Sequence, residues 1–249
     1  MVAGGSLLNV LCLLTLVSLS ALGLNGAVAG PGAHVERAVL CIGEATPAAS
    51  TLARSVGATW TATAPAFPPT ADWAWTWRPP LDRWRAEVVA GPPADGVVVC
   101  TWPPAVTTAP MVDLGPEEWR ERVEWPLALW FTALVAAAER CAEGGSIVAV
   151  VEQPSAVDAA GQAAVVAVAD GMVALVRSLA ASEGPRRVRV NAVTTELFTV
   201  PEVLTGAPPP LASFPGRVDV EVAGAVRMLL SPDSVGVTGT VVRAAGGRP

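Results

Sequence analysis

Short apolar runs alternate with longer helical segments from residue 37 to the end of the chain. This alternation constrains the fold more than any other feature of the sequence. The runs are almost wholly apolar, so they indicate strands that are buried on both faces. Strands and helices in alternation predict a doubly wound parallel sheet with helices on both sides, a three-layer α/β/α architecture. We expect the strands at 37–43, 59–64, 95–101, 146–152, 187–193 and 238–247.

The helical segments carry their own boundary signals. Pro47 stands near the start of the first helix, and Gly57 follows its end. Pro126 lies inside a long helix and should kink it. The other long helix is apolar almost all round up to Leu179, so both of its faces should be covered. Asp219 should cap the last helix. We expect helices at 47–56, 81–90, 113–141, 158–182 and 219–230.

Composition excludes several classes of function. Sixteen basic and 22 acidic residues give a net charge of −6, which argues against a nucleic-acid partner. The chain has no tyrosine, and its basic residues are all arginine, so no phenol or lysine ammonium is available for chemistry. His34 is the only histidine, which excludes a histidine-based triad or a histidine-rich metal site. The four cysteines form no CxxC pair and indicate a reducing compartment, so we expect a cytoplasmic protein.

Residues 1–34 form an apolar extension that precedes a single domain at 35–249. The stretch 7–29 is long enough to cross a bilayer, and Ala27–Ala29 would suit a signal-peptide cleavage site. No Arg or Lys precedes that stretch, although a secretory signal normally has one. Two interpretations stay open: a dispensable extension, or a segment that anchors the protein in a membrane or exports it. Any membrane contact is expected only through residues 7–29.

Tryptophans gather in a proline-rich stretch between residues 65 and 80. Trp73, Trp75 and Trp77 recur there at every second position, with prolines on both sides. The prolines make a long strand or helix implausible. We interpret the stretch as a loop whose indoles cover apolar surface, in preference to an interaction patch.

Four stretches of the chain resemble the short-chain dehydrogenase/reductase family, whose fold is of the Rossmann type. No single stretch is specific, but all four occur in the family's order. The resemblance extends from about Asp95 to the end of the chain, and only weakly to the first strand and helix. The stretches are LGPEEWRERVE at 114–124, GGSIVAVV at 144–151, GQAAVVAVADGMVALVRSLAASEGPRRVRVNAV at 161–193, and DVEVAGAVRMLLSPDSVGVTGTVVRAAGG at 219–247.

The resemblance also locates the family's catalytic positions, and none of them holds the family's residue. Active members carry a Tyr-x-x-x-Lys pair on the second long helix, where this chain has Val165 and Ala169. The serine that binds the substrate carbonyl lies thirteen positions before the tyrosine, at Glu152 here. The asparagine of the first long helix aligns with Pro126. An aliphatic side chain cannot transfer a proton or bind a hydroxyl group.

The cofactor-binding positions are altered in the same way. The family has Thr-Gly-x-x-x-Gly-x-Gly after its first strand, where this chain reads CIGEATPAAST and keeps only Gly43, one position out of place. Glu44 would place a negative charge where phosphates lie. The family's Pro-Gly after its sixth strand becomes Thr195-Glu196 here. Trp60 and Trp102 are expected beside the former cofactor cleft, where they would fill it or stack on a flat ligand.

These departures predict a catalytically inactive member of the family, a pseudoenzyme that binds no cofactor. In the family two long helices pair across a dimer interface, so segments 116–141 and 158–182 are expected to form a homodimer or a heterodimer with an intact reductase. The first alternative is an NAD(P)-dependent ketoreductase with a non-standard site, in which Glu152, Asp170 or Ser155 supplies the chemistry. The second is a sensor that binds a small molecule in the former cofactor cleft.

Overall fold

The computed structural model describes residues 37–43, 45–65, 78–100, 108–154, 159–196 and 217–244. All of them belong to one compact unit, Arg37–Pro249. The expectations for residues 1–34 and for Trp73, Trp75 and Trp77 lie outside the described residues.

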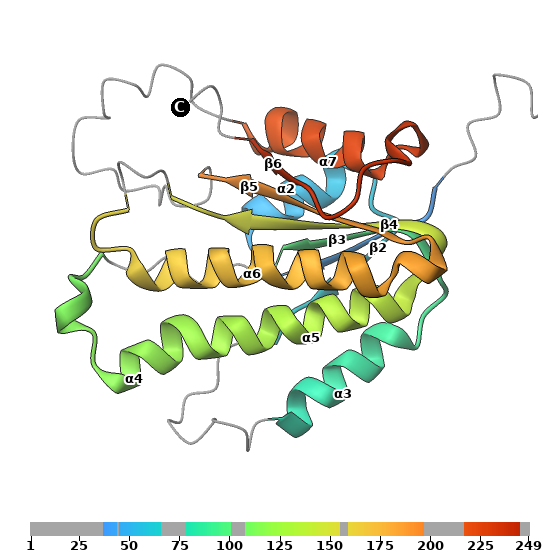
Figure 1. Ribbon diagram of the computed structural model, residues 1–249. Coiled ribbons are helices and arrows are strands. Elements are labelled where there is room, and N and C mark those ends of the chain that lie inside the picture. The colour runs from blue at the N-terminus through green and yellow to red at the C-terminus, as the bar shows by residue number, and fades with distance from the viewer. Residues whose placement is uncertain are drawn as a thin grey trace, which may run out of the picture. The chain divides into compact units, whose positions relative to one another are not determined.

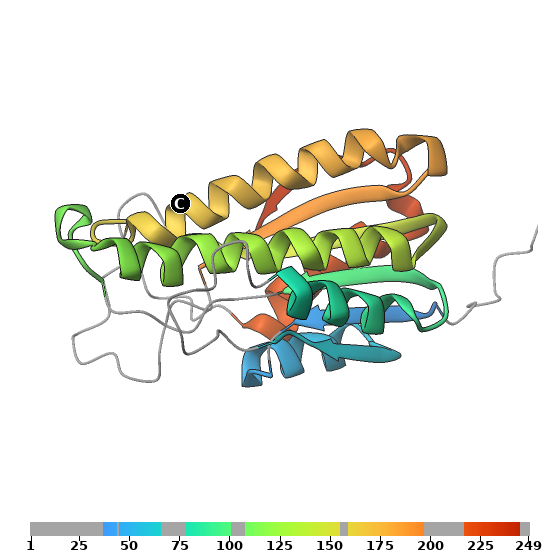
Figure 2. The same ribbon diagram turned by 90° about the horizontal axis from the view of Figure 1, so that it is seen from below.

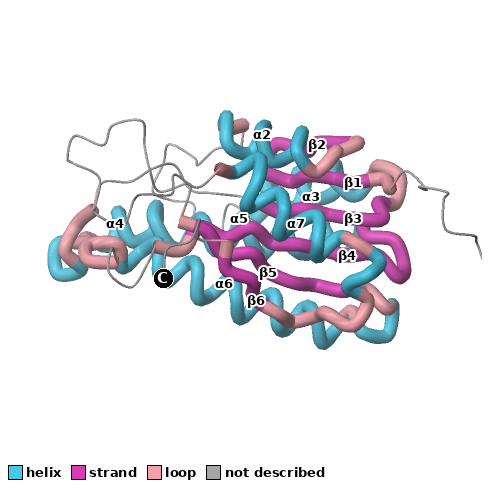
Figure 3. The backbone as a smooth tube through the Cα atoms, turned by 90° about the horizontal axis from the view of Figure 1, so that it is seen from above, coloured by secondary structure: helices cyan, strands magenta, loops and turns pink. Residues whose placement is uncertain are grey.

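Six parallel strands form one sheet in the order β2-β1-β3-β4-β5-β6 (Figures 1 and 3). The doubly wound fold expected from the sequence is confirmed. The chain leaves β1 toward one edge of the sheet and then crosses to β3 on the other side of β1. The switch point therefore lies at the carboxyl ends of β1 and β3. The strands are β1 (Val39–Gly43), β2 (Trp60–Thr63), β3 (Ala94–Cys100), β4 (Cys141–Glu152), β5 (Arg189–Thr195) and β6 (Val241–Arg243).

Helices cover the two faces of the sheet unequally (Figures 1 and 2). Helices α3, α5 and α6 pack on one face, and α2 and α7 pack on the other. The central strands are buried on both faces as a result, which explains their unbroken apolar runs. The helices are α2 (Pro47–Ser55), α3 (Arg78–Val89), α4 (Pro116–Trp119), α5 (Trp125–Arg140), α6 (Ala163–Ser182) and α7 (Ala223–Leu230).

Helix α6 is covered on one side only by the part of the chain that the structure describes. Among the described residues it is the helix that is long and apolar enough to cross a bilayer. Its contacts with β4 and β5 identify it as a helix packed on the sheet, with Val168, Met172 and Val176 buried there. Only 33% of its most apolar 18-residue window is buried, so the described residues do not cover both faces as we expected.

Two helix starts differ from the sequence prediction. The helix around Pro126 accommodates the proline by a π-helical stretch, Arg120–Glu124, in which the Trp125 N–H donates to the carbonyl oxygen of Arg120. This wider turn suits a residue that has no N–H to donate and whose ring would clash with a regular preceding turn. The expected Asp219 cap is wrong: Arg217 occupies the cap position, and Asp219 lies in the first turn, where its carboxylate accepts from Arg217 at 3.0 Å.

A buried arginine ties the last helix to the sheet. Arg189 on β5 is 7% exposed, and its guanidinium donates to the carbonyl oxygens of Leu229 at 2.7 Å, Ser234 at 3.1 Å and Ser231 at 3.2 Å. It also donates to the Ser234 hydroxyl at 2.8 Å. The Ser146 hydroxyl on β4 donates to the same Leu229 carbonyl at 3.0 Å. These bonds tie β4 and β5 to the C-terminal end of α7 and to the turn at Ser231–Ser234 that follows it.

Candidate functional site

Three elements meet where a doubly wound sheet normally holds its ligand. They are the N-terminus of α2 beside β1, the carboxyl ends of β4 and β5, and the first half of α6. Each carries positions at which the sequence departs from the family pattern. The geometry of each decides what chemistry the site can perform.

The N-terminus of α2 is closed by its own residues. The Thr46 hydroxyl accepts from the Ala49 N–H at 3.1 Å, and Pro47, at the first helical position, has no N–H. A helix N-terminus binds phosphate through such backbone N–H groups. One of the first three is missing here and one is already occupied, so this end is poorly suited to a pyrophosphate.

Gly43, the one glycine left from the cofactor loop, is explained by packing within the sheet. A Cβ atom at this position would lie 2.5 Å from the Cys100 sulfur and 2.9 Å from the Cys100 carbonyl oxygen. Gly43 and Cys100 are register partners on β1 and β3. The glycine therefore allows close approach of the neighbouring strand. Glu44 lies outside the described residues.

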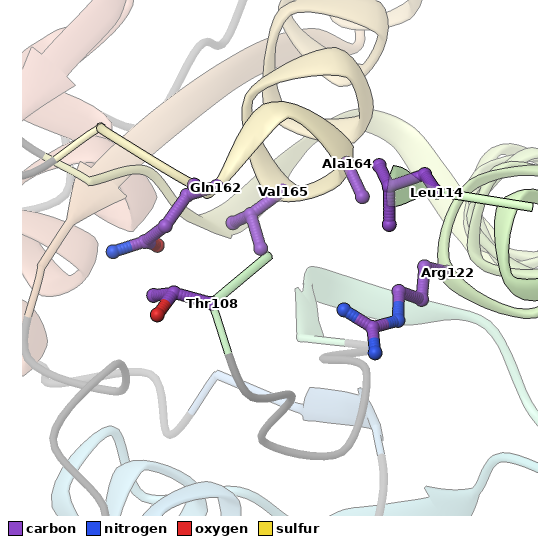
Figure 4. Close-up of a pocket in the computed structure, with 7 residues that line it drawn as sticks. Thr108, Leu114, Arg122, Gln162, Ala164 and Val165 are labelled. Atoms are coloured by element: carbon purple, nitrogen blue, oxygen red, sulfur yellow. The ribbon is translucent and has the colours of Figure 1, made fainter. Parts of the chain in front are cut away.

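The positions of the catalytic tyrosine and lysine lie on α6 as the motif indicates. Val165 lines a small pocket together with residues of the loop that precedes α4 (Figure 4). Ala169 lies one turn further along α6 and is completely buried. Pro126 is buried near the start of α5. The three positions hold aliphatic groups, and none can donate a proton.

The loop at Thr108 and Ala109 lies beside the turn at Gly161 that precedes α6. The Ala109 N–H donates to the carbonyl oxygen of Gly161 at 2.9 Å. Gly161 has a φ of +74°, and a Cβ atom there would lie 3.1 Å from the Cβ of Thr108. The loop thus contacts the turn that leads into α6. The pocket beside it has a free volume of about 20 Å³, room for one or two water-sized groups.

Glu152 ends β4 at the position of the family's serine. Burial raises the pKa of its carboxyl from 4.5 to about 7. It is the register partner of Thr195, and strand alternation puts both on the sheet face toward which Ser146 and Arg189 point, the face of α7. Glu152 therefore lies on the face of the sheet opposite to α6, the helix that carries Val165 and Ala169.

Asp170, the second carboxylate considered from the sequence, has a different setting. The Gln153 side-chain amide donates to it at 3.3 Å, and Asp170 is exposed on α6. Gln153 follows Glu152, so alternation directs their side chains to opposite faces of the sheet. Asp170 and Glu152 therefore lie on opposite sides of the sheet. Ser155 lies outside the described residues.

An ion pair stands where the family's Pro-Gly is expected. The Arg243 guanidinium at the end of β6 donates to the Glu196 carboxylate at 2.5 Å. Glu196 is buried, and its neighbour Thr195 is the last residue of β5. Within the described part of the chain, His, Cys, Asp and Glu residues form no group of three that could hold a metal ion.

The expected position of Trp60 beside the cofactor cleft is wrong. Trp60 is the first residue of β2, so it lies toward the amino ends of the strands. The Arg140 guanidinium lies over its ring, with the central carbon 5.5 Å from the ring centroid. Trp84 on α3 lies at the carboxyl end instead, where its indole N–H donates to the carbonyl oxygen of Thr63 at 2.8 Å. Trp102 lies outside the described residues.

Arg122 also lines the pocket beside Val165, a position that was not expected from the sequence. Its sequence context, a run of alternating acidic and basic residues, is typical of a solvated helix face. The π-helical stretch that contains Arg122 changes the angular phase of the residues around it. A regular 3.6-residue period therefore gives no signal that this side chain points inward.

Comparison with known proteins identifies the family. The family model for enoyl-(acyl carrier protein) reductase matches residues 94–248, more than half of the chain. A search of curated proteins finds no significant match.

Solved structures share the fold at low sequence identity. A short-chain dehydrogenase/reductase from Serratia marcescens is 20% identical with a TM-score of 0.58, over 84% of this chain and 96% of that one. A short-chain dehydrogenase/reductase (glucose/ribitol dehydrogenase) from Brucella melitensis is 19% identical with a TM-score of 0.61, over the same shares. Carveol dehydrogenase from Mycobacterium avium, solved in complex with NAD, is 18% identical with a TM-score of 0.61, also over 84% and 96%. The family match and the shared fold agree with the motifs on β4, α6 and β5, and the chain belongs to the short-chain dehydrogenase/reductase family.

Proposed function

We propose that this chain is a non-catalytic member of the family that acts as a subunit of a dimer. The main support for the proposal lies on α6. There Val165 and the buried Ala169 replace the tyrosine that donates the proton and the lysine beside it. The closed N-terminus of α2 supports it, because Thr46 and Pro47 remove backbone donors that a pyrophosphate would need. Two separate requirements of a reductase, proton transfer and dinucleotide binding, are affected at once.

The outer sides of α5 and α6 support a role as a subunit. Phe131 on α5 is 57% exposed, although its neighbours along the helix are buried. The apolar window of α6 is one-third buried, so the described residues leave much of its surface uncovered for a partner. The partner proposed is a second copy of this chain or an intact reductase of the same family.

Nicotinamide dinucleotides are expected not to bind. Titrating the protein with NAD(H) and NADP(H) should leave its tryptophan fluorescence unchanged after correction for absorption by the ligand. Calorimetry should show no saturable heat up to millimolar concentrations, because the phosphate-binding donors at α2 are missing or occupied. An intact reductase of the family serves as the positive control.

The alternative is a reductase in which Glu152 donates the proton. A carboxyl with a pKa of about 7 is half protonated near neutral pH and is suited to general acid catalysis. Micromolar dinucleotide binding, together with NADPH oxidation on a carbonyl panel that disappears in Glu152→Gln, would establish this alternative and refute the non-catalytic function.

Phe131→Glu is expected to convert a dimer into a monomer, because it places a charge on the apolar outer side of α5. Light scattering after size-exclusion chromatography measures the mass. Met228→Glu is the matched control: Met228 is 51% exposed on α7, which covers the other face of the sheet. A wild-type protein that is monomeric and co-purifies with no reductase would contradict the role as a subunit.

A further inference from the structure

Helix α6 exposes one side along its whole length. It lies beside α5 on one face of the sheet (Figures 1 and 2), with Val168, Met172 and Val176 buried beneath it. The helical period places its exposed residues on the side away from these three. We call these residues the outer stripe of α6: Asp170, Ala174, Arg177, Ser178 and Ala181.

The outer stripe carries one acidic and one basic side chain. Asp170 and Arg177 are two helical turns apart, so they leave the same side of the helix about 10 Å apart along its axis. Ion pairs within a helix join residues three or four positions apart, so this spacing does not favour a pair within one chain. Asp170 accepts from the Gln153 amide at 3.3 Å. Among the described residues, no carboxylate forms an ion pair with Arg177.

Two copies of the outer stripe are complementary in charge. In a dimer with twofold symmetry, each contact between two different residues occurs twice, once in each direction. If two α6 helices pack antiparallel about an axis between Val173 and Ala174, Asp170 of each copy lies opposite Arg177 of the other. Ala174 is small, so the two helix axes can approach each other closely there. One contact between helices therefore forms two ion pairs.

The same two charges argue against other occupants of this surface. Helix α6 is long and apolar enough to cross a bilayer, but an acid and a base in the middle of the outer stripe are costly in hydrocarbon. A different protein would need its own base and acid at the spacing of Asp170 and Arg177. A second copy of this chain has them necessarily.

We infer that α6 packs against α6 of a second copy of this chain, with Asp170 and Arg177 forming ion pairs across the twofold axis. The inference rests on the proposed function, which requires a partner subunit. It names that partner as a second copy and not as an intact reductase.

Reversal of the charges tests the pairing. In a homodimer, Asp170→Arg places arginines opposite each other and Arg177→Asp places carboxylates opposite each other, so each variant should raise the dimer Kd about tenfold or more. Analytical ultracentrifugation measures the Kd, and circular dichroism checks that the exposed positions tolerate the changes. An equimolar mixture of the two variants should form a heterodimer, seen by native mass spectrometry, because each arginine then faces a carboxylate. The double variant Asp170→Arg/Arg177→Asp should dimerise nearly as well as the wild type.

Arg54→Asp is the matched control. It changes the net charge as Arg177→Asp does, but Arg54 is exposed on α2, which covers the other face of the sheet, so the dimer Kd should not change. A wild-type dimer that neither reversal weakens, or a mixture without heterodimers, would overturn the inference and leave the role as a subunit in place. A wild type that pairs only with a reductase would do the same. A wild-type monomer without any partner would overturn both.

Discussion

Arg189→Met is expected to lower the free energy of unfolding by about 3–5 kcal/mol, a large share of the stability of a typical domain. The substitution keeps most of the aliphatic stem and removes the guanidinium. Three carbonyl oxygens and the Ser234 hydroxyl then lose a charged donor in a buried place. For a domain of this size the melting temperature should fall by roughly 8–15 °C. Urea denaturation followed by circular dichroism measures the free energy.

Arg187→Met is the matched control two residues earlier. The Arg187 side chain is 78% exposed, and its ion pair with Glu143, at 2.8 Å, lies on the surface. Exposed pairs contribute at most about 1 kcal/mol, so this variant should denature almost as the wild type does. Equal destabilisation of the two variants would show that the bonds from Arg189 to the end of α7 are not the source of the effect.

Local patterns were sufficient to predict the fold. The runs that became β1, β3 and β4 are apolar without alternation because helices cover both of their faces. Pro47 and Gly57 bound α2 as expected, and Gly57 has a φ of +69°. The boundaries of β4 were predicted less well: it begins at Cys141, because its first residues pair with Ala94 across a register shift that leaves no local signal.

The candidate site was predictable only where a motif fixes positions along one element. Val165 and Ala169 follow from the spacing of the pair on α6, and the structure keeps both on that helix. Trp60 was misplaced although it stands near the start of the predicted strand 59–64, because the start of a parallel strand lies at the edge of the sheet opposite to the ligand site. Arg122 was missed because a π-helical stretch alters the helical period. The burial of Glu152 depends on chain segments that are distant in sequence, so its raised pKa has no signature in the residues around it.

Glu152→Gln is expected to stabilise the protein at high pH and not at low pH. Burial raises the pKa of this carboxyl from 4.5 to about 7, so between these values the folded state holds a proton that the unfolded state has released. The wild type therefore loses stability as the pH rises from about 4.5 to about 7, and the loss is complete above that range. The glutamine carries no charge, so the variant should be more stable than the wild type by about 2–3 kcal/mol at pH 8 and nearly equal to it at pH 4.5.

Glu143→Gln on the same strand provides the comparison, because the Glu143 side chain is 64% exposed and lies at the surface. Its stability relative to the wild type should hardly depend on pH, since a surface ion pair contributes little. Urea denaturation at pH 4.5, 6, 7 and 8 separates the two variants. If Glu152→Gln raises the free energy of unfolding by the same amount at every pH, Glu152 does not take up a proton on folding. We expect Glu152→Gln to show a pH-dependent gain in stability and the wild type to show no NADPH oxidation. This result would mean that the Glu152 carboxyl has a pKa suited to proton transfer but takes part in no reaction, in agreement with the aliphatic residues Val165 and Ala169 on α6.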